Sequence, residues 1–215
     1  MRQVDQVVYQ LWTGTNNMSE NRKKCLESSK NLGVPVKLIT PDNLDEIIVQ
    51  GNPLHKSYKY LIPEHRADYL RSYIMHFHGG CYADIKYYEP SNNYVEMLEL
   101  INKRPEVDII GIPERTTAFH SYERKDVFSR IISSGYLIAR PDTEFTKLWY
   151  TTYVDFLNVY SRQFELYGQH KIGYPIPYIN GMAPFHYTCE VMTRTRPESV
   201  LHCLRPDRRY DIPYK

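Results

Sequence analysis

Two charged residues and a glycine pair stand close together in the first half of the chain. Asp68 and Arg71 are three residues apart, so on a helix they share one face and can form an ion pair. Gly79 and Gly80 follow, and glycine is the residue that best accepts the left-handed backbone at a helix end. The spacing predicts a helix that carries the two charges and ends in a sharp turn.

The segment after this turn carries a second group of chemically useful side chains. Residues 81–85 predict a short strand, and side chains two residues apart on a strand point to the same side. Tyr82, Asp84 and Lys86 therefore share a side, so an aromatic ring, a carboxylate and an ammonium group emerge together. Because ligands of open α/β sheets bind beyond the carboxyl ends of strands, this position predicts a binding site.

The start of the chain places a further aromatic residue at the end of a strand. Residues 7–12 are rich in β-branched and aromatic side chains and end shortly before Gly14, which predicts a buried strand. Trp12 closes this strand, with Leu11 and Thr13 on either side. Trp12 is open to two interpretations, a core aromatic residue or a ring that stacks on a ligand.

The elements that must position these residues alternate between helix and strand. Ala67, Leu70, Ile74 and Phe77 recur at steps of three and four, which predicts a helix with one apolar face that begins at Pro63. The sequence from 168 onward is rich in Pro, Gly and Tyr and is expected to be irregular. Further helices are expected at about 19–32, 41–49 and 141–163, and further strands at 34–39, 107–112 and 131–139.

This alternation predicts one α/β domain over residues 1–215, with a central, mixed but mostly parallel sheet flanked by helices. The chain can equally be one domain of a longer protein. With 42% hydrophobic and 24% charged residues, its composition is ordinary for a globular protein. Tyrosine stands out with 20 copies; its ring and hydroxyl suit sugars and bases, although packing accounts for most single tyrosines.

Charge, cysteine usage and hydropathy argue against several other classes. A net charge of +2 and a pI near 8.2 lack the basic field of a nucleic-acid-binding protein, whose pI is usually above ~9. Four scattered cysteines form no C-x-x-C pair, which argues against structural zinc and fits a reducing compartment. No apolar run approaches the ~18–20 residues of a transmembrane helix, and the polar N-terminus is unlike a signal peptide. We therefore expect a soluble, cytoplasmic protein.

The blocks described above resemble a known enzyme family. The pattern A-D-x-x-R followed by G-G-x-Y-x-D is similar to the donor-binding region of GT-A-fold glycosyltransferases, which include the large clostridial toxins and α-glycosyltransferases with a D-x-D motif. Residues 9–14 are similar to the opening strand of these families. The chain also resembles a chlorovirus glycosyltransferase domain that decorates capsid glycans, which would place it in the host cytoplasm.

The resemblance implies roles for the residues that bind the donor. Trp12, flanked by Leu11 and Thr13, would stack on the uracil of a UDP-sugar. Asp68 and Arg71 would hydrogen-bond the transferred sugar or the ribose.

The resemblance also implies a metal site. Tyr82 would line the nucleoside pocket, and Asp84 matches the first acid of the D-x-D motif. The motif works because a diphosphate leaving group needs a divalent cation, here Mn2+ or Mg2+, to neutralise its developing charge.

Lys86 is the point at which the sequence departs from the family, because it stands where the second acid usually ligates the metal. Three explanations stay open. Asp84 takes over as the metal ligand with help from a late residue, or Lys86 supplies charge to the diphosphate itself. In the third, the domain binds the donor without turning it over.

A late metal ligand is expected from the C-terminal region. His202 is the first choice, and His186 is the second. Arg205 and Arg208 belong to a run of arginines whose guanidinium groups can bind phosphate oxygens, unless they are solvated surface charges.

The remaining expectations concern catalysis. Ser134 is expected on the strand that faces the transferred sugar, which makes Asp84, Arg71 and Ser134 the catalytic candidates. The family favours retention of anomeric configuration, with the leaving phosphate oxygen accepting the acceptor's proton.

The expected function is transfer of a hexose, glucose-like or deoxy, from a UDP-sugar to a glycan or glycoprotein acceptor. The alternative is a non-catalytic module that binds nucleotide-sugars or glycans. The sequence contains none of the motifs that are typical of dinucleotide-binding enzymes, P-loop kinases or serine hydrolases.

Overall fold

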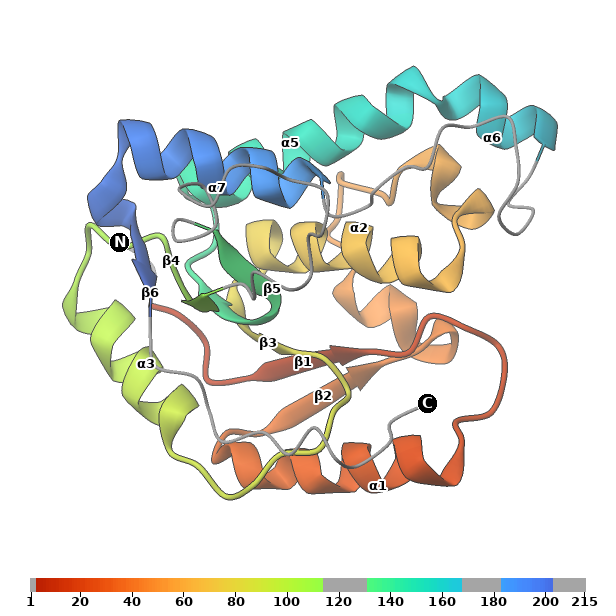
Figure 1. Ribbon diagram of the computed structural model, residues 1–215. Coiled ribbons are helices and arrows are strands. Elements are labelled where there is room, and N and C mark those ends of the chain that lie inside the picture. Colours follow the sequence, from red (N-terminus) through yellow and green to blue (C-terminus); the bar gives the residue numbers. More distant parts are fainter. Residues whose placement is uncertain (1–2, 114–130, 168–182, 203–215) are drawn as a thin grey trace, which may run out of the picture.

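A computed structural model describes residues 3–113, 131–167 and 183–202 of the chain. Its centre is a six-stranded sheet in the order β2-β1-β3-β5-β4-β6 (Figure 1). The strands are β1 (Val8–Leu11), β2 (Val36–Ile39), β3 (Gly80–Ala83), β4 (Ile109–Pro113), β5 (Ile132–Ala139) and β6 (Val200–His202).

The sheet is mixed but mostly parallel, as the sequence predicts. Strand β1 pairs in parallel with both β2 and β3, and β4 pairs in parallel with β6. Strand β5 runs antiparallel to both of its neighbours, β3 and β4. The other five strands therefore share one direction, and their carboxyl ends lie along one edge of the sheet.

Helices cover both faces of this sheet. In Figure 1, α2, α5 and α7 lie above it, and α1 and α3 lie below it. Each layer encloses its own cluster of buried apolar side chains. The α-helices are α1 (Glu20–Ser28), α2 (Pro63–Phe77), α3 (Asn93–Lys103), α5 (Glu144–Val159), α6 (Ser161–Tyr167) and α7 (Ala183–Thr195). Shorter 3-10 helices are η1 (Ser29–Leu32), η2 (Pro41–Ile47), η3 (Lys56–Tyr60) and η5 (Pro197–Ser199).

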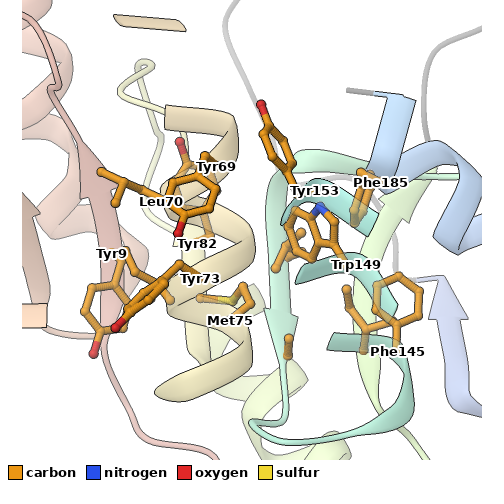
Figure 2. Close-up of a cluster of buried hydrophobic side chains, with 14 of the residues drawn as sticks. Tyr9, Tyr69, Leu70, Tyr73, Met75, Tyr82, Phe145, Trp149, Tyr153 and Phe185 are labelled. Carbon is orange, nitrogen blue, oxygen red and sulfur yellow. The ribbon is translucent and has the colours of Figure 1, made fainter. Parts of the chain in front are cut away.

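Helix α2 is the element that carries most of the candidate site. Pro63 starts it, where the missing N–H of proline costs nothing. Tyr69 and Tyr73 are fully buried, and Figure 2 shows them beside Tyr9 and Tyr82, with the aromatic side chains of α5 opposite. The hydroxyls of Tyr69 and Tyr73 accept hydrogen bonds from the backbone of the segment before α2. These tyrosines therefore fix the position of the helix rather than bind a ligand.

The turn from α2 into β3 needs its two glycines. Gly79 and Gly80 have φ values of 69° and 96°, in the left-handed region that L side chains rarely adopt. A Cβ atom on Gly79 would also lie 2.4 Å from Cδ of Pro141. The expected sharp turn is confirmed. It places Tyr82 of β3 within hydrogen-bond distance of Arg71 on α2.

Two predictions about the C-terminal part of the chain are wrong. The helix expected over 141–163 ends at Val159, and α6 starts at Ser161 after a break at Tyr160. The segment expected to be irregular contains α7, which buries Phe185, Cys189 and Met192 at steps of four and three. This helical period stands in the sequence, but the surrounding prolines and glycines obscured it.

Helix α3 was also not anticipated, although Tyr94, Met97, Leu98 and Ile101 follow a helical period and are all buried. The other expected elements are present, with their ends shifted by a few residues. No helix in the described part of the chain is both long and apolar enough to cross a bilayer.

Candidate functional site

A cleft of about 490 Å3 opens at the carboxyl ends of β1 and β3. It is lined by 11–14 at the end of β1, by Arg22 of α1, by one face of α2, and by residues 82 and 84–86 around the end of β3. The site expected beyond these strand ends is therefore a hollow that four segments build together. From α2 the lining residues are Pro63, Glu64, Ala67, Asp68 and Arg71.

A second hollow of similar size, about 520 Å3, lies between α1 and the edge strand β2. Its charged lining residues are Glu27 and Lys30, which form an ion pair with each other. The first cleft gathers three carboxylates and three cations, so chemistry favours it as the functional site.

Arg71 is the centre of the charged cluster in the first cleft. Its Nη2 lies 3.6 Å from Oδ1 of Asp68 and 3.5 Å from Oδ1 of Asp84, and it donates to the Tyr82 hydroxyl at 3.2 Å. Its Nη1 donates to the Ser134 hydroxyl. Burial alone would lower the pKa of Arg71, but Tyr82, Asp84 and Asp68 together raise it. The guanidinium therefore remains a fixed positive charge that joins the two acids.

The backbone of Asp84 is held in place by hydrogen bonds to three other residues. Its N–H donates to the Gly135 carbonyl at 3.0 Å, which extends the pairing of β3 with β5. Its own carbonyl accepts from the Tyr88 hydroxyl at 2.8 Å and from Nε2 of Gln10 at 3.3 Å. Three neighbouring segments thus fix the position from which the carboxylate enters the cleft.

The carboxylate of Asp84 is engaged on both oxygens. Oδ1 accepts from the Tyr82 hydroxyl at 3.1 Å and faces Arg71, while Oδ2 lies 2.9 Å from Nζ of Lys86. Burial raises the pKa of the Tyr82 phenol, although Arg71 opposes the shift, so the hydroxyl stays protonated and remains a donor. The expected convergence of Tyr82, Asp84 and Lys86 is confirmed in geometry.

Asp68 is the second acid of the cluster, with a side chain 15% exposed. Burial raises its pKa, and the positive charge of Arg71 lowers it, with the desolvation effect larger. An additional hydrogen-bond donor, such as a ligand hydroxyl, would stabilise the charged form of this desolvated carboxylate.

Trp12 lies at the rim of the cleft rather than in the core. Its indole N–H donates to the Asn16 carbonyl at 2.9 Å, and the Arg22 guanidinium lies 5.8 Å from its ring centre. The side chain is half-buried and lines the cleft. Leu11 is buried and also lines the cleft. The Thr13 hydroxyl donates to the Pro63 carbonyl at 2.5 Å, which ties the end of β1 to the start of α2.

Other expected site residues lie apart from the cleft. Ser134 is buried beneath Arg71 and does not line the first cleft. Its position therefore does not allow direct contact with a sugar bound there. His186 and His202 are also absent from the lining residues. Arg205 and Arg208 lie outside the described residues.

The sheet register separates His202 from the acid it was expected to assist. Tyr82 pairs with Leu137, Leu137 with Gly111, and Gly111 with His202. Two strands therefore lie between β3 and β6, which corresponds to about 14 Å at the usual strand spacing. The two strand ends share an edge of the sheet, but the structure does not bring His202 to Asp84.

The described residues alone do not make a complete metal site. They contain no group of three or more His, Cys, Asp or Glu side chains that could hold a cation. Mg2+, however, is commonly bound by one or two carboxylates together with substrate phosphates and water. Asp84 fits a cation that a diphosphate would help to hold, whereas the described residues alone do not surround one.

Arg22 and Gly135 contribute to this site although neither was predicted from the sequence. Arg22 comes from α1, donates to the Ile85 carbonyl at 2.5 Å and contacts the cleft beside Trp12. A Cβ atom at Gly135 would lie 2.6 Å from Oδ2 of Asp84, so this glycine makes room for the carboxylate. Both depend on distant parts of the chain meeting, for which a local pattern gives no signal.

Comparison with known proteins gives a likeness in structure. No protein-family model matches the sequence, and no curated protein is similar to it in sequence. The structure is similar to a solved structure described as PaToxG Glycosyltransferase, with a TM-score of 0.51 and 14% identity. The alignment covers 90% of this chain and 70% of that one. The chain therefore has a fold that a glycosyltransferase also has.

Proposed function

We propose that this protein is a glycosyltransferase that takes its donor, a UDP-sugar, into the cleft at the ends of β1 and β3. The observation that carries the proposal is the meeting of Trp12, Asp68 and Asp84 in that cleft. A rim aromatic residue suits a base, and the acids suit sugar hydroxyls and a cation. The fold shared with a glycosyltransferase supports the same conclusion.

The position of each group suggests how the donor lies. The uracil stacks on the exposed part of the Trp12 indole, near Arg22, whose charge can reach the first phosphate. The diphosphate then passes between Arg22 and Lys86, both of which line the cleft. The sugar reaches Asp68, whose buried carboxylate accepts a hydrogen bond from a sugar hydroxyl. The positions of Asp68 and Asp84 are fixed by Arg71, which is itself held by Tyr82 and Ser134.

The reaction breaks the bond between the anomeric carbon and the diphosphate oxygen. The acceptor hydroxyl oxygen forms the new bond on the same face, and its proton passes to the leaving phosphate oxygen, so the configuration is retained. A divalent cation at Asp84, Mn2+ or Mg2+, would supply positive charge to the diphosphate. The protein contributes by orienting the sugar through Asp68 and by holding Asp84 in place.

We propose a hexose as the transferred group, glucose-like or deoxy, and a glycan or glycoprotein as the acceptor. The half-open cleft leaves the sugar end accessible from the side of α2, where Glu64 is exposed. Because Asp68 is the single acid at the proposed sugar position, we expect it to select only weakly among hexoses with different hydroxyl arrangements.

Calorimetric titration of UDP, GDP and CMP, each with and without Mn2+, tests the donor class. Preferential binding of UDP, followed by release of UDP from UDP-glucose or a UDP-deoxyhexose on addition of a glycan acceptor, is the expected result. Tighter binding of GDP than of UDP would contradict the donor assignment. Failure of all three nucleotides to bind would remove the proposed function.

A non-catalytic module that binds nucleotide-sugars is the second candidate, and the ion pair between Lys86 and Asp84 favours it, because that pair covers the acid that a metal would use. Turnover separates the two candidates. A protein that binds UDP-sugars but neither hydrolyses nor transfers them, and that gains turnover in Lys86→Asp, is the module.

A further inference from the structure

The ion pair between Asp84 and Lys86 places a positive charge where a metal ion would bind. Nζ of Lys86 lies 2.9 Å from Oδ2 of Asp84, and Oδ1 is occupied by Tyr82 and Arg71. A divalent cation that binds a carboxylate oxygen at about 2 Å would meet the ammonium group at close range. Like charges at such a distance repel strongly in a partly buried site. The metal and Lys86 therefore compete for the same oxygen.

The two cations that the described residues place beside Asp84 differ in how tightly they are enclosed. The Arg71 side chain is 8% exposed and is held by Tyr82, Ser134 and Asp68. The Lys86 side chain is 29% exposed, lines the cleft, and ends a flexible four-carbon stem. Lys86 can therefore move away from Asp84 within the cleft, whereas Arg71 cannot move without losing several buried contacts.

The charges of the cleft explain where Lys86 would go. Among the lining residues within the described ranges, cations and carboxylates balance, so the protein side of the cleft carries no net charge. A diphosphate brings about two negative charges that this balanced lining does not neutralise. Among the described cations that line the cleft, Lys86 carries its ammonium group on a long stem beside Asp84, where it can turn towards the diphosphate. The cations are Arg22, Arg71 and Lys86, and the carboxylates are Glu64, Asp68 and Asp84.

We propose that Lys86 is an exchangeable partner that couples metal binding to donor binding. In the free protein it neutralises Asp84 and keeps a lone divalent cation out. When a metal and a nucleoside diphosphate enter together, Asp84 takes the metal and the Lys86 ammonium transfers to a phosphate oxygen. Metal and donor then bind cooperatively, and neither binds well alone. This inference rests on the proposed function, because the group that receives Lys86 is the donor's diphosphate.

The test is a set of calorimetric titrations on the whole protein: Mn2+ alone, UDP with a chelator, and UDP with Mn2+. Lys86→Met keeps the apolar stem and removes the charge, and Lys86→Arg keeps the charge. Lys103→Met is the matched control, because Lys103 forms an exposed ion pair with Glu99 on α3, on the other face of the sheet. Circular dichroism checks that each variant is folded.

For the wild type we expect weak binding of Mn2+ alone and a gain in UDP affinity of about tenfold or more when both are present. Lys86→Met should tighten Mn2+ alone by about tenfold and weaken UDP with Mn2+, so that the coupling shrinks. Lys86→Arg should keep most of the wild-type coupling, and Lys103→Met should keep all of it.

Two results would overturn the exchange while leaving the proposed function intact. One is an unchanged affinity for Mn2+ alone in a folded Lys86→Met protein, because the competition for Asp84 would then be absent. The other is equal affinity of the wild type for UDP with Mn2+ and with chelator. Absence of UDP binding under every condition would instead remove the proposed function together with the exchange. The Mn2+ titration, which needs no nucleotide, tells these failures apart.

Discussion

Gly135 lies against the Asp84 carboxylate, so that a Cβ atom in its place would lie 2.6 Å from Oδ2 and 3.1 Å from Cγ of the acid. The Gly135 carbonyl also accepts the hydrogen bond from the Asp84 N–H. A residue of β5 thus fixes the backbone of the acid and leaves space for its side chain. This contact joins residues 51 positions apart and exists only because β3 and β5 pair in this register.

Gly135→Ala should therefore displace the Asp84 carboxylate without unfolding the protein, because the backbone of Gly135 is not in the left-handed region. We expect UDP affinity in the presence of Mn2+ to fall by about tenfold or more, about 1.4 kcal/mol. Calorimetric titration measures it. Gly51→Ala is the control, since nothing lies within 4 Å of its Cβ position and its φ of 82° predicts only a stability cost. Unchanged binding in Gly135→Ala would mean that the exact position of Asp84 is unimportant.

Asp84→Asn should abolish the dependence of UDP binding on metal. The amide keeps the size of the side chain and can still accept from Tyr82, but it is a poor ligand for a hard divalent cation. We expect the titration with Mn2+ to match the titration with chelator. Glu64→Gln serves as the comparison, because it removes an exposed carboxylate from the same cleft. Wild-type metal dependence in Asp84→Asn would exclude Asp84 as the metal ligand.

Trp12→Ala should weaken UDP binding by ~1–3 kcal/mol, the range for the loss of base stacking on an aromatic ring. The indole is half-buried at the rim of the cleft, outside both apolar cores, so the melting temperature should change little. The control is Trp149→Phe, because Trp149 is buried in the core between α5 and α7. That variant should lower the melting temperature and leave UDP affinity unchanged. If Trp12→Ala instead lowered the melting temperature and left UDP affinity unchanged, the role of Trp12 would be structural only.

Local periodicity explains which parts of this site could be predicted from the sequence. Asp68 and Arg71 share a helix face because they are three apart, and Tyr82, Asp84 and Lys86 share a strand side because they are two apart. The glycine pair predicted the turn that joins the helix and the strand. Each of these relations spans a few residues, so the sequence contains it directly.

The remaining parts depend on contacts between distant segments. Ser134 was expected to face the sugar, but the antiparallel pairing of β5 with β3 places it under Arg71. His202 was expected beside Asp84, but the strand order puts β5 and β4 between them. Arg22 reaches the cleft only because α1 packs beside the end of β3. Strand order and register are properties of the whole chain, which is why local patterns missed these three placements.

Asp68→Asn should separate stability from function, because burial raises the pKa of this acid above its ordinary value of 3.8. In the folded protein Asp68 holds its proton up to a higher pH than in the unfolded chain. The charged form therefore costs stability above the folded pKa, and this cost fades as the pH falls towards 3.8. Asn carries no charge at any pH, so the variant should be more stable than the wild type at pH 7. The difference should shrink as the pH falls through the same window, as measured by denaturant unfolding at several pH values.

The same variant should lose donor affinity, since an amide is a weaker acceptor for a sugar hydroxyl than a carboxylate held beside Arg71. UDP-sugar binding should fall while UDP binding changes little, because the base and diphosphate lie on the other side of the cleft in the proposed arrangement. A variant that is less stable than the wild type at pH 7 would show that the Arg71 ion pair outweighs the burial of Asp68. Equal losses for UDP and UDP-sugar would place Asp68 at the nucleoside instead of the sugar.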